Sequence, residues 1–284
     1  MRIKTLVENT SVSEDYGSEH GLSLYIETNE HKILFDVGAS ELFLQNAKKL
    51  DVDIHDVDLL VISHGHYDHG GGLKIFLQKN SKAKVYVHQH AFDKHYASRS
   101  VGAPAPIGLD DDLKQNSQIV FTSDDYSIDK GVWLFSNVTQ KEPRPRSNSG
   151  LLMEHNGQMT DDTFAHEQNL VVEEDGKTLL VTGCAHNGII NILEHFHLLK
   201  GRMPDCVIGG FHLSSPSRSG ENEDADTINR IGKHLIGTKA KYYTCHCTGI
   251  EAYERLKSAM GNSIDYLSVG SEIRTPPIDT IKDC

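Results

Sequence analysis

Residues 63–72 read Ser-His-Gly-His-Tyr-Asp-His-Gly-Gly-Gly. This stretch directly follows the apolar run at 58–62, which predicts a short buried strand. Four side chains that commonly bind metals, His64, His66, Asp68 and His69, then fall within six residues. The three glycines let the backbone turn sharply into a helix expected at 73–79.

The chemistry of these four side chains predicts a site for two divalent cations. A tight loop after a strand can turn His64 and His66 to one cation, and Asp68 and His69 to a second. Neutral imidazole and carboxylate suit zinc, with manganese or iron as alternatives. The other interpretation, a histidine-rich surface loop, is disfavoured by the density of the ligands and by their position after a strand.

The pattern of apolar residues predicts an α/β fold. Antiparallel strands open each half of the chain, and alternating helices and strands follow. Strands are expected at 3–7, 22–26, 33–35, 58–62, 85–87, 118–122, 132–135, 169–173, 178–182, 206–208, 241–244 and 266–269. Helices are expected at 41–50, 73–79, 188–199, 224–235 and 250–260. Two mixed sheets packed face to face with helices outside, an αββα sandwich, would bury these apolar faces.

The middle of the chain, about 89–165, is less regular than the rest. We expect one domain over 1–284, with this segment as an insertion or pocket wall. It contains a stiff basic loop at 141–148, in which Arg144 and Arg146 could bind a phosphate or carboxylate of a small-molecule substrate. The alternative for the two arginines is a solvated loop.

Composition limits the classes of partner. Lys plus Arg is 28 and Asp plus Glu is 40, which gives a net charge of −12 and argues against broad binding to nucleic acid. The N-terminus has no apolar core of signal-peptide length, and no apolar run approaches the roughly 20 residues that span a bilayer. The five cysteines, an odd number, are typical of free thiols. The expected location is the cytoplasm, away from membranes, and the oligomeric state stays open.

The His-x-His-x-Asp-His motif after an apolar strand resembles the signature of the metallo-β-lactamase superfamily, and the similarity extends over nearly the whole chain. Three further stretches, at 183–189, 209–213 and 245–249, resemble the branch of dihydropterin-(ribofuranosyl)aminobenzene-phosphate synthase-like proteins. The resemblance implies the metallo-β-lactamase fold and a binuclear metal site.

The resemblance also implies the remaining site residues. Asp36, in an early turn, corresponds to a position that supports the ligands. Cys184 stands where the superfamily usually has a bridging Asp, and it is a possible thiolate ligand, with a small buried residue as the alternative. His166, next to Glu167, and His186 are alternatives for the third histidine of the site, and we favour His186.

Two later histidines complete the expected site. His246 is the expected late ligand. His212 follows two glycines and is a candidate acid, anion donor or ligand, with a structural histidine as the alternative. Asp68 is expected to orient the nucleophile as well as to bind metal, as the matching Asp does in the family.

The site therefore predicts a metal-dependent hydrolase that uses a metal-activated water on an ester, lactone or phosphoester, or the related pterin-type synthase reaction. A single-iron oxidoreductase on the same fold is the first alternative. The family's di-iron oxygen reductases have Glu where this chain has His66, which favours hydrolysis, whereas single-iron sulfur dioxygenases keep a His there. The second alternative is a non-catalytic, metal-containing ligand-binding protein.

Overall fold

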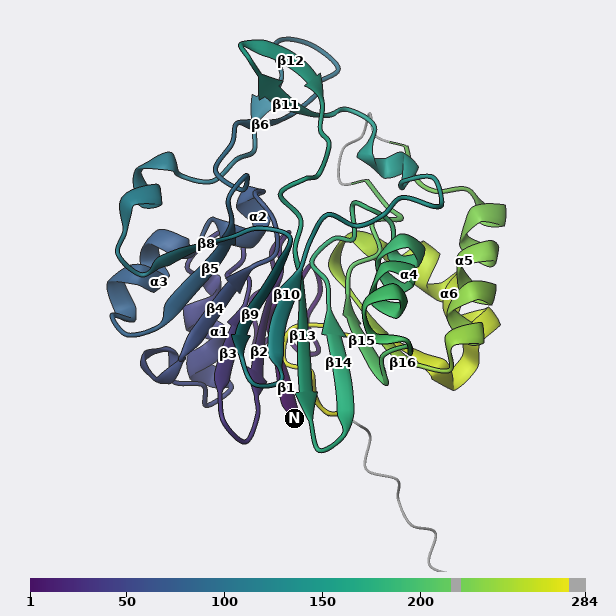
Figure 1. The fold of residues 1–284 in the computed structure, drawn as a ribbon, viewed down its shortest axis with the longest axis horizontal. Coiled ribbons are helices and arrows are strands. Elements are labelled where there is room, and N and C mark those ends of the chain that lie inside the picture. Colours follow the sequence, from purple (N-terminus) through teal and green to yellow (C-terminus); the bar gives the residue numbers. More distant parts are fainter. Residues whose placement is uncertain (216–220, 276–284) are drawn as a thin grey trace, which may run out of the picture.

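The structure is a computed structural model that describes residues 1–215 and 221–275. Two seven-stranded sheets lie face to face, and helices cover both outer faces (Figure 1). The first sheet has the order β18-β1-β2-β3-β4-β5-β8. Its strands are β1 (Arg2–Val7), β2 (Ser23–Glu27), β3 (Lys32–Phe35), β4 (Leu59–Ile62), β5 (Lys84–His88), β8 (Ile119–Thr122) and β18 (Glu272–Arg274). The expected sandwich is confirmed.

The second sheet has the order β17-β16-β15-β14-β13-β10-β9. Its strands are β9 (Asp125–Asp129), β10 (Val132–Phe135), β13 (Asn169–Glu174), β14 (Lys177–Val181), β15 (Cys206–Gly209), β16 (Lys241–Thr244) and β17 (Ile264–Tyr266). The β13–β14 hairpin turns at Asp175-Gly176, where both residues have positive φ, of 52° and 72°. Asp-Gly is favoured at such turns because the two central residues must adopt this backbone conformation.

Alternating side chains produce the layers of the core. In β3, Ile33 and Phe35 pack between the two sheets, whereas Leu34 packs on the opposite face of its sheet. Helices α1 (Leu42–Lys49) and α3 (Leu73–Lys79) cover that outer face. The outer face of the second sheet is covered by α4 (Ile189–Lys200), α5 (Ala225–Thr238) and α6 (Ile250–Met260) (Figure 1).

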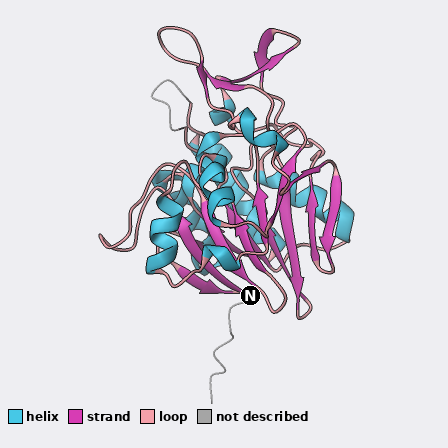
Figure 2. Cartoon of the chain, turned by 90° about the vertical axis from the view of Figure 1, so that its left-hand side faces the viewer, coloured by secondary structure: helices cyan, strands magenta, loops and turns pink. Residues whose placement is uncertain are grey.

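A small third sheet stands apart from the sandwich, and we call it the cap sheet (Figures 1 and 2). Its order is β12-β11-β6-β7. The strands are β6 (His95–Ala97), β7 (Ala105–Pro106), β11 (Leu151–His155) and β12 (Gln158–Asp161). All four lie in the segment 89–165, which also supplies β8, β9 and β10 to the large sheets. The segment therefore has more regular structure than its sequence indicates.

Several elements differ from expectation, among them β9 and β18, for which no strand is expected. The last strand of the second sheet is β17 (Ile264–Tyr266), earlier than the expected 266–269. The tight loop expected over the histidine motif contains a short helix, α2 (Tyr67–Gly70). The residues that the structure describes also form five short 3-10 helices: η1 (Ile54–Asp56), η2 (Asp111–Gln115), η3 (Arg146–Asn148), η4 (His246–Thr248) and η5 (Gly261–Ser263). In the described ranges, no helix has the length and apolar character that crossing a membrane requires.

Candidate metal centre

The candidate site lies where several parallel strands end. Strands β3, β4 and β5 are parallel in the first sheet, and β14, β15 and β16 are parallel in the second, so their carboxyl ends lie at one edge of each sheet. The histidine motif follows β4. The residues that follow the three strands of the second sheet contribute the other members, and the whole set is buried: His64, His66, Asp68, His69, Cys184, His186, His212 and His246.

Several residues at this edge have a backbone conformation that is rare for residues other than glycine. The φ angles are 60° at Asp36, 56° at Ala185, 48° at His212 and 50° at His246. Left-handed backbone in such residues is uncommon and is concentrated at functional sites, where the surrounding structure holds it. Its presence in four loops around one cluster supports a functional role for the cluster.

Asp36 orients two of the histidines. Its Oδ2 accepts a hydrogen bond from Nδ1 of His69 at 2.7 Å. The Ser63 hydroxyl donates to the same carboxylate at 2.7 Å and therefore accepts from Nδ1 of His64 at 2.8 Å. The expected supporting position of Asp36 thus corresponds to direct contacts in the structure, and Asp36 itself is fully buried.

His186 and His246 are held in matching ways by an asparagine each. Nδ1 of His186 lies 2.8 Å from Oδ1 of Asn148, and Nδ1 of His246 lies 2.8 Å from Oδ1 of Asn9. A buried glutamate accepts from each backbone N–H: Glu167 from His186 at 2.6 Å, and Glu8 from His246 at 2.7 Å. Both pairs of partners fix the position and the ring orientation of the histidine.

These contacts leave four lone pairs directed at one another. The neutral form of each imidazole carries one N–H, which Nδ1 donates to oxygen in all four rings, and Nε2 of the neutral ring is then an unprotonated acceptor. Burial lowers the pKa of His69, but the Asp36 and Asp68 carboxylates outweigh burial and raise it to about 9, so this ring loses a proton when it binds a cation. The Nε2 atoms of His64 and His186 are 3.3 Å apart, and those of His69 and His246 are 3.2 Å apart. Two ligands on one tetrahedral cation, at about 2.0–2.1 Å each, lie about 3.3 Å apart. The residues present therefore fit two metal ions.

The candidate ligand atoms form two sets. His64, His66 and His186 make up the first. The second consists of His69 and His246 with Asp68, whose Oδ2 is 3.3 Å from Nε2 of His246 and 3.7 Å from Nε2 of His69. Burial lowers the pKa of His64 and of His186, and nearby histidines add to the effect, so both rings are neutral and able to bind a cation.

Cys184 lies beside the second set. Its Sγ is 3.1 Å from Nε2 of His69. Burial raises the pKa of the Cys184 thiol, and Cys247 nearby adds to the effect. A bound cation would favour the thiolate instead, because coordination deprotonates a thiol.

The structure shows that the ring nitrogens of His166 and His186 have different surroundings. The Gly65 N–H donates to Nδ1 of His166 at 2.8 Å, and Nε2 of the same ring lies 3.3 Å from Asp162. Both nitrogens of His166 are therefore engaged, whereas Nε2 of His186 faces His64. The geometry supports His186 as the ligand. Glu167 accepts three hydrogen bonds, from the backbone N–H of His186 and from the N–H and side chain of Asn187, and so holds this loop.

The remaining candidates lie at different distances from the cluster. The ring of His212 is 4.1 Å from that of His186, and neither of its nitrogens has a hydrogen-bond partner among the described residues. The Arg144 guanidinium lies 5.7 Å from the ring of Phe164, which stacks on His186 at 4.5 Å. Arg146 is exposed and forms ion pairs with Glu221 at 2.9 Å and Asp224 at 3.4 Å.

His20 also lies beside the cluster, although it is not among the residues that the sequence predicts for the site. Its Nε2 lies 3.2 Å from Oδ2 of Asp68, and its ring lies 4.6 Å from that of His246. His20 comes from the loop before β2, and its side chain is 35% exposed, so it lies between the buried cluster and solvent. No local sequence pattern identifies it, because it is a single histidine in a polar loop.

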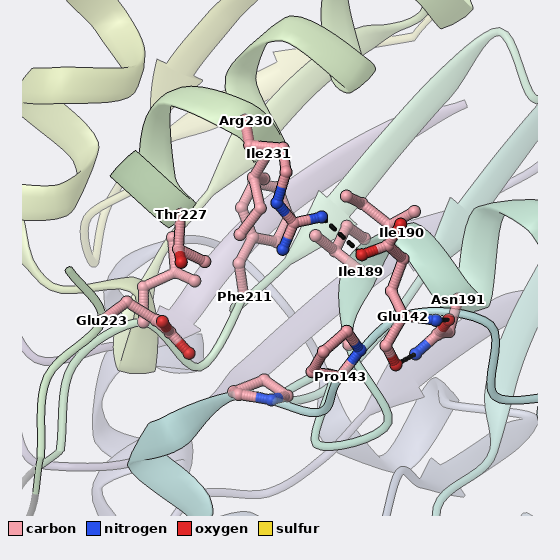
Figure 3. A pocket seen from close by; sticks show the side chains of 13 residues that line it. Glu142, Pro143, Ile189, Ile190, Asn191, Phe211, Glu223, Thr227, Arg230 and Ile231 are labelled. Atoms are coloured by element: carbon pink, nitrogen blue, oxygen red, sulfur yellow. Dashed lines mark hydrogen bonds and ion pairs between the residues drawn. The ribbon is translucent and has the colours of Figure 1, made fainter. Parts of the chain in front are cut away.

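A small cavity lies next to the site, between the basic loop and helices α4 and α5 (Figure 3). Its volume is about 30 Å³, enough for one water molecule. An ion pair between Arg230 and Glu142, with atoms 2.6 Å apart, lies at its edge. No candidate ligand residue of the metal centre lines this cavity.

Comparison with known proteins agrees with the fold. The sequence model of the metallo-beta-lactamase superfamily matches residues 16–225, and the chain belongs to that superfamily. The solved structure of Tm1679, described as a metal-dependent hydrolase of the beta-lactamase superfamily, is 31% identical, with a TM-score of 0.81 and coverage of 96% of this chain and 98% of that one.

Two curated relatives come from Methanocaldococcus jannaschii. The uncharacterized protein MJ0448 is 30% identical over 95% of this chain and 99% of its own length. The enzyme named 7,8-dihydropterin-6-methyl-4-(beta-D-ribofuranosyl)-aminobenzene-5'-phosphate synthase is 27% identical over 96% of each chain. The second similarity agrees with the expected branch of the superfamily.

Proposed function

We propose that the protein is a metal-dependent hydrolase that uses two divalent cations, zinc or alternatively manganese or iron, to cleave an ester, lactone or phosphoester. The observation that carries the proposal is the two facing pairs of imidazole Nε2 atoms, 3.3 and 3.2 Å apart, each ring fixed through Nδ1. Tm1679, whose description is that of a metal-dependent hydrolase, has a similar sequence over nearly the whole chain.

Each of the two ligand sets would bind one cation. His64, His66 and His186 would hold one cation, and Asp68, His69 and His246 the other, with Cys184 as a further donor. A pair of cations supplies a water molecule of lowered pKa and positive charge for a developing oxyanion. The Asp68 carboxylate would orient the attacking water. It lies 3.3 Å from Nε2 of His246, 3.7 Å from Nε2 of His69 and 3.2 Å from Nε2 of His20.

His212 is suited to donate a hydrogen bond to the reacting group. Its ring is buried, and both of its nitrogens lack a partner among the residues that the structure describes. A buried polar group without a partner is costly, so its retention next to the cluster supports a role with substrate. The ring contact with His186 places His212 beside the first ligand set.

An anionic substrate would fit the surroundings of Arg144. Its guanidinium lies over Phe164, and Phe164 in turn stacks on the ligand His186. The Nε of Arg144 is buried without a partner among the described residues. The relative from Methanocaldococcus jannaschii is named for a phosphate-containing pterin compound, and a phosphorylated pterin-type compound is therefore a candidate for this chain as well.

The proposal is tested by assaying zinc, manganese and iron forms against a panel of lactones, thioesters, phosphodiesters, phosphomonoesters and a phosphorylated pterin compound. Turnover of at least one class, abolished by Asp68→Ala with the fold retained, is the expected result. The alternative of a single-iron oxidoreductase predicts one iron per chain, an absorption spectrum of iron and no hydrolysis. A non-catalytic protein predicts bound metal without turnover of any class.

A further inference from the structure

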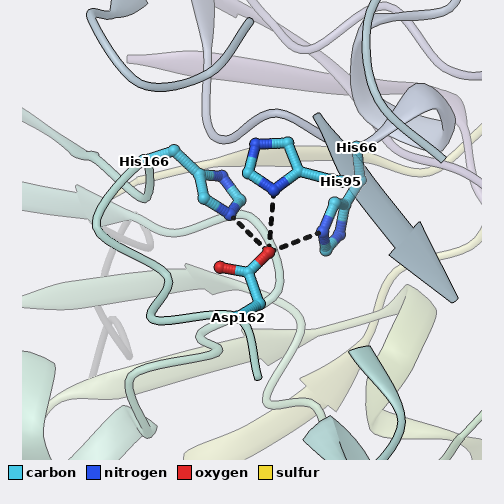
Figure 4. Close-up of side chains that lie close together, drawn as sticks. All are labelled: His66, His95, Asp162 and His166. Atoms are coloured by element: carbon cyan, nitrogen blue, oxygen red, sulfur yellow. Dashed lines mark hydrogen bonds and ion pairs between the residues drawn. The ribbon is translucent and has the colours of Figure 1, made fainter. Parts of the chain in front are cut away.

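Asp162 lies at the centre of a second buried cluster, next to the candidate metal centre. Its Oδ2 lies 2.8 Å from Nδ1 of His95, 3.3 Å from Nε2 of His166 and 3.9 Å from Nε2 of His66. Figure 4 shows the three imidazole rings pointing toward this one carboxylate. All four side chains are buried.

The distances show that this cluster is a hydrogen-bonded group and not a third metal site. Two ligand atoms on one tetrahedral cation lie about 3.3 Å apart, whereas His95 and Asp162 are at hydrogen-bond distance, 2.8 Å. The Gly65 N–H donates to Nδ1 of His166, so the proton of that ring is on Nε2 and is donated to Asp162. His166 has no lone pair left for a cation.

Asp162 is well placed to control His66. The Nε2 of His66 has no hydrogen-bond partner among the described residues and faces the carboxylate at 3.9 Å. A negative charge at this position favours a proton on Nε2, which leaves Nδ1 as the atom that binds metal. Outer carboxylates of this kind fix the tautomer and the orientation of ligand histidines.

The same carboxylate holds the backbone of the motif through a second path. Asp162 accepts from His166, and His166 accepts from the N–H of Gly65, the residue between the first two ligand histidines. Gly65 must be glycine here, because a Cβ would clash with the carbonyl oxygen of Ala91 and would lie 2.9 Å from Nε2 of His95. The motif is therefore packed closely against this cluster.

The cluster also connects the metal centre to the cap sheet. Asp162 directly follows β12, and its N–H donates to the carbonyl oxygen of Leu151 in β11 at 3.0 Å. His95 is the first residue of β6. The other carboxylate oxygen, Oδ1, accepts from the N–H of Phe164 at 2.7 Å. The base of the cap sheet thus fixes the carboxylate on which the three histidines converge.

We propose that Asp162 is a positioning residue that orients His66 toward the first cation. Because Asp162 is itself held by the base of the cap sheet, it also connects the cap sheet to the first ligand set. This inference rests on the proposed function, because it assumes that the first ligand set binds a cation. Asp162 accepts hydrogen bonds from His95 and His166 and from the N–H of Phe164, and hydrogen bonds of this kind favour the ionised form of a carboxyl group. The carboxylate is therefore charged.

The test compares Asp162→Asn with Asp161→Asn in the metal-loaded protein. Asp161 is the neighbouring residue and is exposed, so it is a matched control. Each protein is titrated with a chelator while bound zinc is counted. In Asp162→Asn, the ion that the chelator removes first should be bound about 10- to 100-fold more weakly than the corresponding ion of the wild-type protein. The second ion and both ions of Asp161→Asn should keep wild-type affinity.

Cobalt substitution identifies which ion is lost. A thiolate-to-cobalt absorption band that disappears in Cys184→Ser reports the second ligand set, and it should persist in Asp162→Asn. Wild-type affinity for both ions in Asp162→Asn, or an equal loss of both, would overturn the inference. If Asp162→Asn does not fold, Asp162→Glu, which keeps the charge and moves the carboxyl group by one methylene, is judged by the same outcomes. A wild-type protein that binds no metal contradicts the proposed function itself.

Discussion

Asn148 holds His186 at two points: its Oδ1 lies 2.8 Å from the ring Nδ1, and its Nδ2 donates to the main-chain oxygen of the same histidine at 2.8 Å. Asn9 repeats this arrangement at His246, with 2.8 Å to Nδ1 and 3.5 Å to the carbonyl oxygen. The two asparagines lie in loops that are far apart in the sequence. Each turns the Nε2 of its histidine toward a partner histidine.

Asn148→Ala and Asn9→Ala should each weaken metal binding by about 10- to 100-fold, which is the usual effect of removing a group that orients a ligand histidine. The loss should be larger for Asn148, because Asn9 is exposed and water can replace its oxygen. Competition with a chelator measures the metal affinity of both variants. Asn29→Ala, in the exposed β2–β3 turn, serves as the control. Affinities equal to that control would contradict the orienting role.

Arg144→Ala and Arg146→Ala should differ. For an anionic substrate, Arg144→Ala should raise KM about 10-fold or more, since a hydrogen bond to a charged group contributes about 1.5–3 kcal/mol. Arg146→Ala should leave KM unchanged, because its guanidinium pairs with Glu221 and Asp224 at the surface. Steady-state kinetics of the two variants provide the measurement. Equal effects would remove the distinction between the two arginines.

His212→Ala should lower kcat by about 10²- to 10³-fold, as removal of one oxyanion donor does in other enzymes. The bound metal should be unchanged, because the ring is not needed for either ligand set. His212→Gln, which keeps a donor, should recover part of the activity. If His212 were purely structural, the His212→Ala protein would instead have a lowered melting temperature, and its folded fraction would have a normal kcat.

Removal of metal should destabilise the fold. A ligand present at about 100 times its Kd stabilises a native protein by about 2.7 kcal/mol, so the chelated protein should melt at a lower temperature than the zinc form. The difference should be smaller in His69→Ala, which lacks a ligand of the second set. Cys184→Ser should show a small or intermediate change. Scanning calorimetry measures these shifts, and identical melting curves with and without metal would contradict bound cations.

The large sheets could be predicted from the sequence because their strands show a regular apolar pattern. Leu59 and Val61 of β4 face the other sheet, whereas Leu60 and Ile62 face the helices. The cap sheet could not be predicted in this way. Its strands have two to five residues, and β12 is exposed along its whole length, so no apolar face marks it.

The histidine motif and the late ligands could be recognised because their ligands directly follow predicted strands. The groups that orient them could not. Asn9 and His246 are 237 residues apart, and His95 and Asp162 are 67 residues apart, so only the fold brings them together. His166 shows most clearly that sequence position alone does not identify a ligand. Its position is typical of a metal ligand, but its two nitrogens form hydrogen bonds with Gly65 and Asp162.

The most direct test of the binuclear site is the metal content of His186→Ala and His166→Ala beside wild type, measured by elemental analysis after saturation and desalting. We expect about two ions per chain in wild type, about one in His186→Ala, and nearly the wild-type content in His166→Ala. Loss of an ion in His166→Ala together with full content in His186→Ala would contradict this account of the site.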